Sequence, residues 1–284
     1  MTRNITPPVT YQGGKTRLAS AVVDVLWAGE DACYADMCCG SGAIGLALVS
    51  RGLPPNGLLM VDRGPWGAFW HRIGTGTFDL SELRALVDDI PSSPRMIKSW
   101  VKERVSEPVP ADPTPMFLLI QATAIGGAWV CIADGKWKLS SGLRDYWMPT
   151  PTSSRRSPVN PMMPMPATIV DRVVSVCEKM QGIDGRCCGI GACMDNIADV
   201  TYIDPPYRST TGASMDCDAV EYALKIGGAW GSEAVPLSDR AVKLSAGRSK
   251  GGMTGGRKFA NAEYLSWVCS ARALLTPTPE PTDD

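Results

Sequence analysis

In the stretch Asp36-Met-Cys-Cys-Gly-Ser-Gly42, a short apolar segment ends in a turn whose two glycines allow the backbone to bend sharply. A helix is predicted to follow from Ala43 to Ser50, because a helix-ending glycine, Gly52, lies just beyond it. Leu58 to Val61 is a continuous apolar run of the kind found in buried parallel strands, and it stops at Asp62. Strand, glycine turn, helix, strand and acid in this order predict an α/β protein with a doubly wound sheet.

This pattern is interrupted in the middle of the chain and then returns. Proline is dense from Pro149 to Pro166, which predicts loop, whereas apolar residues resume a helical period from Ile169. Further helices are predicted at residues 18–27, 79–90, 96–105, 169–180 and 264–275, and further strands at residues 200–203 and 225–230. We therefore expect a core formed by residues 1–74 and 167–275, an insertion at residues 75–166, and a disordered acidic tail at residues 276–284.

Composition limits the classes of function. The net charge is −1, so any contact with nucleic acid has to come from local basic patches. The 10 cysteines include no C-x-x-C pair and the only histidine is His71, so neither a zinc site nor a disulfide framework is predicted. No apolar run approaches the roughly 20 residues of a membrane span, and the first residues lack a signal-peptide pattern. These features predict a cytoplasmic protein with reduced thiols.

The glycine turn has the spacing of a cofactor motif. Gly40-Ser-Gly-Ala-Ile-Gly45 matches G-x-G-x-x-G, and Asp62 follows Gly42 by 20 residues. A carboxylate at this place can accept hydrogen bonds from both hydroxyls of a ribose. The pattern predicts an adenosine-type cofactor, and it fits a dinucleotide-dependent enzyme as well as a methyltransferase.

A lysine motif, Tyr11-Gln-Gly-Gly-Lys-Thr16, lies upstream of that turn. Its end resembles the G-K-T of a P-loop. That loop needs a glycine five residues before Gly14, and Val9 stands there instead. An ATPase is therefore not predicted from this segment.

A third motif, Asp204-Pro-Pro-Tyr207, directly follows the predicted strand at residues 200–203. The two prolines remove two N–H donors, which leaves a carboxylate and a carbonyl oxygen as neighbouring acceptors. Two acceptors suit one NH2 group, because that group has two hydrogens to donate. The tyrosine ring can stack on a planar base. The motif therefore predicts a site that holds the amino group of an aromatic ring.

The order of the three motifs along the chain resembles that of the Dam-type adenine-N6 DNA methyltransferases, a family with bacteriophage members. The resemblance implies a Rossmann-like S-adenosylmethionine-dependent methyltransferase core, with a target-recognition region in the insertion at residues 75–166. It also implies roles for single residues. The residues implied to bind S-adenosyl-L-methionine are Tyr11, Lys15, Asp36, Gly40, Gly42, Asp62, Asp195 and Asp204, and those implied to be catalytic are Asp204, Pro205, Pro206 and Tyr207.

Two segments are predicted to contact double-stranded DNA. Residues 238–258 hold six basic residues and one acidic residue among glycines, which suits a mobile loop on phosphates. Residues 136–156 combine arginines with Trp137, Tyr146 and Trp147, side chains that can reach or wedge bases. The residues predicted to bind DNA are Arg144, Arg155, Arg156, Lys243, Arg248, Lys250, Arg257 and Lys258.

The expected reaction is methyl transfer from S-adenosyl-L-methionine to the amino group of an adenine flipped out of DNA, with no metal and no membrane. The resemblance also implies restriction–modification as a setting, in a bacterial or phage-infected host cell. Four alternatives stay open. They are N4-methylation of cytosine, methylation of RNA or of a protein amide, an NAD-dependent oxidoreductase built on Gly40 to Asp62, and a DNA-binding module without activity.

Overall fold

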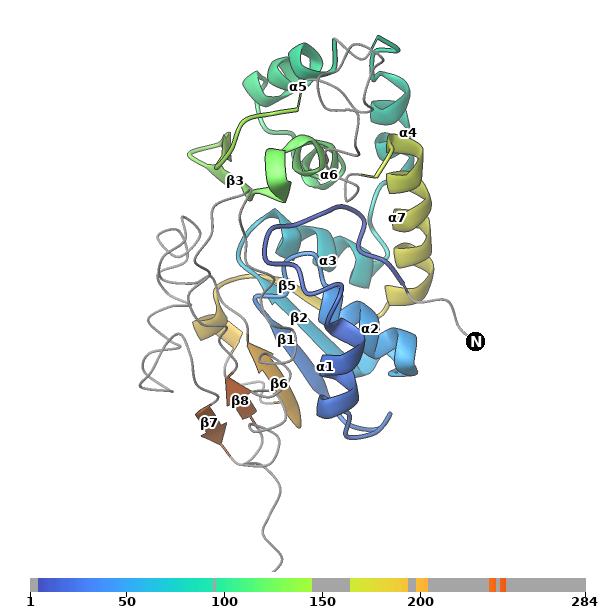
Figure 1. The fold of residues 1–284 in the computed structure, drawn as a ribbon, viewed down its shortest axis with the longest axis vertical. Coiled ribbons are helices and arrows are strands. Elements are labelled where there is room, and N and C mark those ends of the chain that lie inside the picture. Colours follow the sequence, from blue (N-terminus) through green and yellow to red (C-terminus); the bar gives the residue numbers. More distant parts are fainter. Residues whose placement is uncertain are drawn as a thin grey trace, which may run out of the picture.

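A computed structural model describes residues 5–93, 96–144, 164–193, 198–203, 235–238 and 241–243. Within these residues, six strands form one sheet in the order β5-β2-β1-β6-β8-β7, with helices packed against it (Figure 1). The strands are β1 (Tyr34–Met37), β2 (Leu58–Asp62), β5 (Asp184–Cys187), β6 (Val200–Ile203), β7 (Val235–Ser238) and β8 (Ala241–Lys243). Only β7, at one edge, pairs antiparallel. The expected α/β class with a parallel sheet is therefore confirmed.

Strand β1 lies at the point where the winding of the sheet changes direction. From β1 the chain passes to β2 and then to the edge strand β5, and it returns on the other side of β1 as β6. Met37 at the end of β1 pairs with Val61 on one side and with Ile203 on the other. In open α/β sheets, ligands bind beyond the carboxyl ends of the strands at such a switch point. The ends of β1, β2 and β6 therefore mark the region in which to look for a site.

The central strands are buried on both faces. The helices of the first core segment are α1 (Ala19–Leu26), α2 (Ala43–Arg51) and α3 (Pro65–Thr75), and a short 3-10 turn, η1 (Pro55–Gly57), precedes β2. Leu58 and Met60 of β2 belong to the main core with these helices. Leu59 and Val61 belong to a smaller cluster with Cys193, which ends the 3-10 turn η4 (Ile190–Cys193) after β5. Because strand side chains alternate between faces, burial on both sides explains the continuous apolar run.

Glycines allow helix α3 to lie directly on strand β5. A Cβ on Gly67 or Gly74 of the helix would overlap a carbonyl oxygen of the neighbouring backbone. A Cβ on Gly185 of the strand would overlap the backbone of Trp70. Neither α3 nor β5 is predicted from the sequence. Their close contact matters for the site, because it sets the position of α3, whose tryptophans contact the glycine turn.

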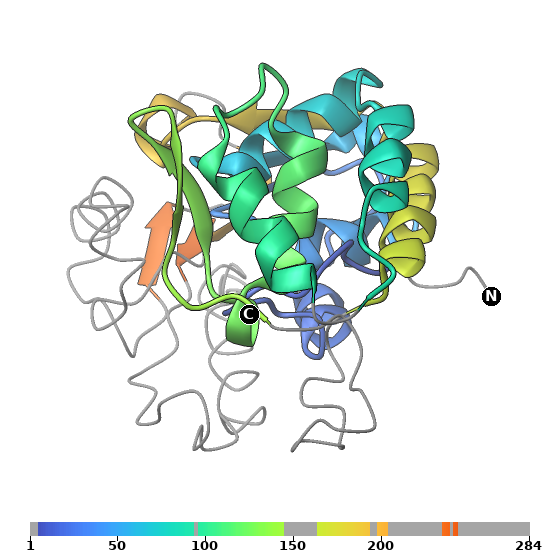
Figure 2. The ribbon, with the colours of Figure 1, turned by 90° about the horizontal axis from the view of Figure 1, so that it is seen from above.

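The predicted insertion forms a lobe of helices with one hairpin. Its elements are α4 (Leu80–Asp88), α5 (Ile97–Ser106), α6 (Thr114–Thr123), η3 (Ile125–Gly127), β3 (Val130–Ala133) and β4 (Lys136–Leu139). All 10 residues of α6 are buried, because α4, α5 and the hairpin lie around it (Figure 2). Helix α7 (Pro166–Met180) packs against α3 and α4, so one cluster of apolar side chains joins the lobe to the core. The boundaries at residues 75 and 166 stay predictions.

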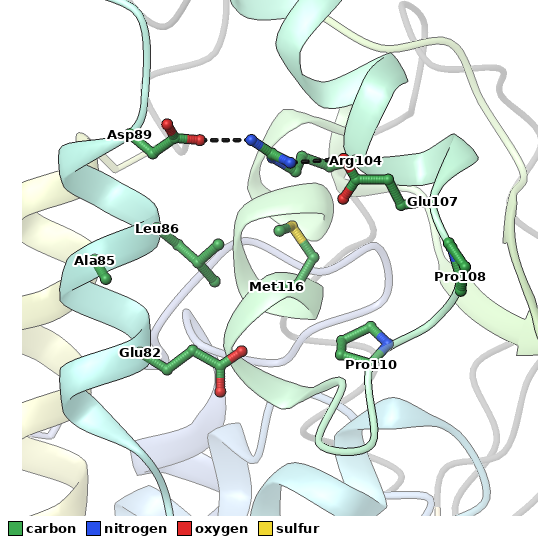
Figure 3. A pocket seen from close by; sticks show the side chains of 9 residues that line it. All are labelled: Glu82, Ala85, Leu86, Asp89, Arg104, Glu107, Pro108, Pro110 and Met116. Carbon is green, nitrogen blue, oxygen red and sulfur yellow. Dashed lines mark hydrogen bonds and ion pairs between the residues drawn. The ribbon is translucent and has the colours of Figure 1, made fainter.

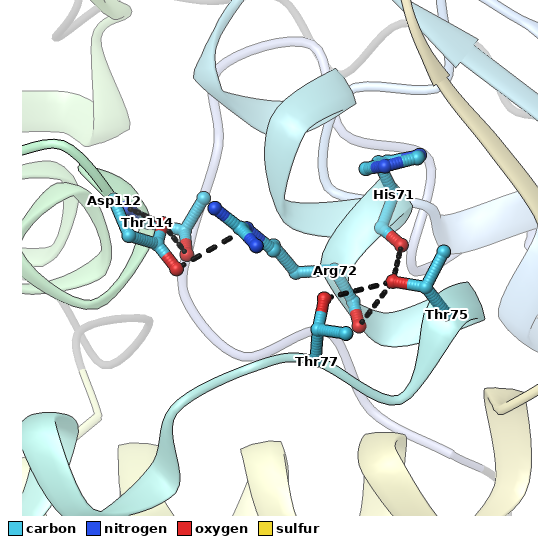
Figure 4. Close-up of polar contacts among 6 residues, drawn as sticks. All are labelled: His71, Arg72, Thr75, Thr77, Asp112 and Thr114. Carbon is cyan, nitrogen blue, oxygen red and sulfur yellow. Dashed lines mark hydrogen bonds and ion pairs between the residues drawn. The ribbon is translucent and has the colours of Figure 1, made fainter.

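Polar contacts also connect the lobe with the end of α3 (Figure 4). Nε of Arg72 lies 3.3 Å from Oδ2 of Asp112, in the segment before α6. Oδ1 of Asp112 accepts hydrogen bonds from the N–H and the hydroxyl of Thr114 at 3.0 and 2.7 Å. On the other side of Arg72, the hydroxyl of Thr75 donates to the carbonyl of His71 at 2.8 Å. A partly exposed ion pair contributes only about 0–1 kcal/mol, so the apolar cluster is the main link between lobe and core.

Most predicted elements within the described residues are confirmed. They are the helices at residues 19–26, 43–51, 80–88, 97–106 and 166–180 and the strands at residues 34–37, 58–62 and 200–203. Two expectations are wrong. Trp137, expected to reach or wedge bases, is buried and belongs to the apolar cluster of the core. The sequence predicts loop across residues 238–258, but Ser238 ends β7, and Ala241–Lys243 forms β8 because its backbone pairs with β6. The predicted strand at 225–230, the helix at 264–275 and the tail at 276–284 lie outside the described residues. Among the described helices, none combines the length and apolar character needed to cross a membrane.

Candidate functional site

The glycine turn lies at the carboxyl end of β1, where the sequence places it. Gly40 and Gly42 have φ angles of 50° and 74°, which favour glycine. The N–H of Cys39 donates to the carbonyl of Val61 at 2.9 Å, and the N–H of Gly42 donates to the carbonyl of Cys39 at 2.8 Å. These bonds hold the turn against the end of β2, and α2 starts directly after Gly42.

Aromatic rings of the protein fill the space beside the two glycines. A Cβ on Gly40 would lie 2.8 Å from Cε1 of Tyr11, and a Cβ on Gly42 would overlap the ring of Trp70. The indole N–H of Trp70 donates to the carbonyl of Gly40 at 2.8 Å. From the sequence, these glycines are expected to allow the close approach of a ligand. The structure gives a further reason, which is that both glycines admit side chains from elsewhere in the chain.

Two carboxylates hold the backbone of the turn. Asp36 is 2% exposed, and its Oδ2 accepts the N–H of Gly45, in the first turn of α2, at 3.1 Å. Asp62 accepts the N–H of Gly40 on Oδ2 at 3.0 Å and the N–H of Gly64 on Oδ1 at 2.8 Å. A carboxylate offers about four acceptor positions, and a carboxylate at the end of β2 can accept ribose hydroxyls. Asp36 lies near the N-terminus of α2, where the helix dipole favours a negative charge.

Both acids act on the thiol of Cys39 in the turn. Burial, followed by the charges of Asp62 and Asp36, raises the pKa of the Cys39 thiol well above its ordinary value. Cys39 is therefore a neutral thiol near neutral pH. The same field favours a positively charged group of a ligand and disfavours an anionic one.

The lysine motif packs on the glycine turn. The N–H of Gly14 donates to the carbonyl of Tyr11 at 3.0 Å, and Gly13 has a φ of 88°, which closes a tight turn. A Cβ on Gly14 would lie 3.3 Å from Oγ of Ser41, so the two glycine-rich segments are in contact. The ammonium group of Lys15 donates to the carbonyl of Gly13 at 2.9 Å. The structure thus brings Tyr11 and Lys15 to the turn that Asp36 and Asp62 hold.

Tryptophans of α3, which none of the three motifs predicts, complete the wall behind this turn. Trp66 meets Tyr11 edge to face with ring centroids 5.9 Å apart, and it meets Phe117 of α6 at 5.0 Å. Trp66 is 2% exposed and Trp70 is fully buried. A signal for α3 was present, because apolar residues at positions 66, 69, 70 and 73 follow a helical period after Pro65.

Several predicted site residues lie outside the part of the chain that the structure describes. They are Asp195, Asp204, Pro205, Pro206, Tyr207, Arg155, Arg156, Arg248, Lys250, Arg257 and Lys258. Ile203, the residue before Asp204 in the sequence, ends β6 beside Met37, and Lys243 of β8 pairs with it from the other side. Arg144 lies in the lobe, where its backbone N–H donates to the carbonyl of Thr123 at 2.9 Å. The roles of all these residues stay predictions.

A cavity of about 400 Å³ lies in the lobe, between α4 and the segment that leads into α6 (Figure 3). The guanidinium of Arg104 reaches across it, with NH2 at 2.7 Å from Oδ2 of Asp89 and NH1 at 2.6 Å from Oε1 of Glu107. Burial, followed by the charges of Asp112 and Asp79, raises the pKa of Glu82 on its wall. The arginine is already paired with acids of the wall, so the cavity offers no clear sign of a ligand class.

Two cysteines meet after β5. The sulfur atoms of Cys188 and Cys193 lie 2.8 Å apart. Burial, followed by the hydrogen bond with Cys193, raises the pKa of Cys188 to about 12, so its neutral thiol dominates near neutral pH. In the described ranges, no three histidine, cysteine or acidic side chains are grouped so that they could hold a metal ion.

No protein-family model matches this sequence, and a search of curated proteins found no match. The geometry of the described residues and the chemistry of the motifs are therefore the basis for a function.

Proposed function

We propose that this chain is an S-adenosyl-L-methionine-dependent DNA methyltransferase that methylates the N6 amino group of adenine. The observation that carries the proposal is the order of the sheet. It sets the glycine turn after β1 beside the end of β6, where the sequence continues from Ile203 into Asp204-Pro-Pro-Tyr207. A cofactor-type turn and an amine-type motif thus follow two adjacent parallel strands at a switch point, which is where a methyl donor and its acceptor can meet.

The charge of the turn supports S-adenosylmethionine over a dinucleotide. A dinucleotide binds its pyrophosphate at the N-terminus of the first helix, through backbone N–H groups and the helix dipole. Here the buried carboxylate of Asp36 accepts the N–H of Gly45 at that place. A carboxylate there repels a pyrophosphate, whereas the sulfonium and ammonium groups of S-adenosylmethionine are cations. The residues of the turn therefore fit the methyl donor.

The proposed roles follow from the chemistry of each side chain. Asp62 accepts the ribose hydroxyls, and Tyr11 borders the cofactor beside Gly40. Bound S-adenosylmethionine supplies a methyl group that is activated for transfer. The carboxylate of Asp204 and the carbonyl of Pro205 each accept one hydrogen bond from the target amine. These two hydrogen bonds localise the lone pair of the nitrogen and orient the amine. Positioning and electrostatics then supply most of the catalysis.

The target base has to leave the duplex to reach such a site. Flipping costs a few kcal/mol of stacking and pairing, and stacking on Tyr207 returns about 1–3 kcal/mol. The sequence alone supports the roles of Asp204 to Tyr207.

Calorimetric titration separates this proposal from an oxidoreductase. The protein is expected to bind S-adenosylmethionine, or its demethylated product, and not to bind NAD. Asp62→Ala should weaken that binding about tenfold or more, because hydrogen bonds to a charged group contribute about 1.5–3 kcal/mol. Asp88→Ala, which removes an exposed acid at the end of α4, is the matched control. Binding of NAD without binding of S-adenosylmethionine would contradict the proposal.

Mass spectrometry of digested DNA tests which base is modified. Unmethylated DNA is incubated with protein and cofactor and is then hydrolysed to nucleosides. The N6-methylated adenine nucleoside is the expected product. N4-methylated cytosine in its place would agree with methylation of an amino group and would overturn adenine as the target.

A further inference from the structure

Gln121 is a buried polar residue that the proposed reaction does not use. It is fully buried in α6, a helix in which every residue is buried. Its amide nitrogen donates to two consecutive carbonyls, that of Gly127 at 3.1 Å and that of Ala128 at 2.8 Å. Only the NH2 end of the side chain can serve two carbonyl oxygens, so the orientation of the amide is determined.

The carbonyl of Gly127 is shared with the lysine motif. The N–H of Gln12 donates to it at 2.8 Å. Gly127 has a φ of 68°, and a Cβ on it would lie 3.1 Å from Cγ2 of Thr10 and 3.2 Å from the carbonyl oxygen of Thr10. The backbone on both sides of Tyr11 is therefore set against the turn that Gln121 holds.

Tyr11 connects this backbone segment with the glycine turn. The tyrosine lies between Thr10 and Gln12, and its ring fills the space beside the Cα of Gly40. The N–H of Gly40 in turn donates to Asp62. An unbroken series of contacts thus runs from α6 of the lobe to the carboxylate proposed to hold the ribose.

The polarity of Gln121 is costly for folding. Its Oε1 is buried and has no hydrogen-bond partner among the described residues. Such an orphaned acceptor costs about 1–3 kcal/mol, whereas an apolar side chain would suit a helix buried on all sides. Buried polar groups can persist in a core because they impose one geometry on their partners.

We propose that Gln121 is a positioning residue that couples the lobe to the cofactor side of the site, by holding the Gly127 turn on which the Tyr11 segment rests. Its effect on catalysis rests on the proposed function, whereas the mechanical coupling does not. A shift of α6 or of the Gly127 turn would move Tyr11 against Gly40, so occupancy of the lobe and of the cofactor site would influence each other.

The test compares Gln121→Met with Thr123→Val. Methionine keeps the length of the side chain and removes the donor. Thr123 is equally buried in the same helix, but its hydroxyl donates to the carbonyl of Ile120 at 2.8 Å, within that helix, so its loss disturbs α6 without touching Gly127. Hydrogen exchange of peptides covering residues 9–14 is measured without cofactor, and KM for cofactor and kcat are measured with DNA.

Gln121→Met should speed exchange at residues 9–14 and raise KM for cofactor about tenfold, with kcat at saturating cofactor retained. Thr123→Val should lower stability and change neither quantity. Unchanged exchange in Gln121→Met, or equal effects of both variants, would overturn the coupling. If wild-type protein binds no S-adenosylmethionine, the proposed function fails and the exchange measurement still decides the coupling. Gly127→Ala, which pushes on Thr10 directly, replaces Gln121→Met if that variant does not fold.

Discussion

At the scale of single residues, Gly42 meets two separate demands. Its φ is 74°, and a Cβ on it would overlap the ring of Trp70 and lie 2.7 Å from Cε of Met60. Gly13 has a comparable φ of 88°, but a Cβ on it would meet nothing within 4 Å. Comparing substitutions at the two glycines therefore separates the cost of backbone strain from the cost of overpacking.

We expect Gly42→Ala to lower the free energy of unfolding by about 1–3 kcal/mol more than Gly13→Ala, which is the usual cost of forcing added volume into a packed site. Urea denaturation of the two variants measures the difference. Equal losses would show that Trp70 and Met60 can move aside without lowering stability. Position 42 would then need glycine only for its backbone conformation.

The sequence predicts which of these residues gather, but not what each one touches. The spacing of the motifs was enough to expect Asp36 and Asp62 at the ends of β1 and β2. That Asp36 accepts the N–H of Gly45 depends on the angle at which α2 leaves the turn. Gln121 carries no motif at all, and only its contacts distinguish it from the apolar residues around it.

At the scale of elements, Asp79 is the N-cap of helix α4. It precedes α4, and its carboxylate accepts the N–H groups of Ser81 and Glu82, both at 2.9 Å. The hydrogen bond from the hydroxyl of Ser81, followed by that from the N–H of Glu82, lowers the pKa of Asp79. Because the folded pKa lies below the unfolded one, this stabilisation is complete above the ordinary aspartate range and is lost as pH falls through the folded value.

Asp79→Asn keeps an N-cap but does not titrate. The stability of wild-type protein relative to this variant should therefore be constant above about pH 5 and should fall steadily towards about pH 2. Chemical denaturation across that range measures both proteins. A difference that does not change with pH would mean that the Asp79 carboxylate is not held in the folded state.

In helix α3, replacing a glycine with alanine is expected to lower the stability of the protein, which is the opposite of the usual effect. Glycine inside a helix is normally less favourable than alanine by about 1 kcal/mol. A Cβ on Gly74 would overlap the carbonyl oxygen of Ile183, just before β5. We expect Gly74→Ala to be destabilising, as judged by thermal or urea unfolding, because it separates α3 from the strand. Stabilisation by this change would show that the helix can lift off β5 freely.

The elements that are not predicted from the sequence differ in how clearly their residues indicate secondary structure. The hairpin of β3 and β4 turns at Asp134-Gly135, a dipeptide typical of two-residue hairpin turns, so it could have been predicted. Strand β5 has the sequence Asp-Gly-Arg-Cys and no apolar run. It exists because β2 pairs with it and α3 lies on its glycine, which are contacts made by distant parts of the chain.

At the scale of the whole molecule, the switch point beside β1 unites the motifs. The glycine turn, the lysine motif and the end of β6 come from three separate parts of the sequence, and the sheet order brings the turn and the strand end together. This arrangement was predictable from strand, turn and helix signals, because doubly wound sheets follow few topologies. The coupling of the lobe to the turn was not, because it depends on backbone carbonyls that have no sequence signature.

The most direct test of the proposed activity is transfer of a labelled methyl group from S-adenosylmethionine to unmethylated DNA. Wild-type protein and the control Asp88→Ala should transfer the label equally. At saturating cofactor, Asp204→Ala should transfer the label at least about a hundredfold more slowly, a loss typical of removing a group that stabilises the transition state. Transfer by Asp204→Ala at the wild-type rate, or no transfer by wild-type protein, would contradict the account.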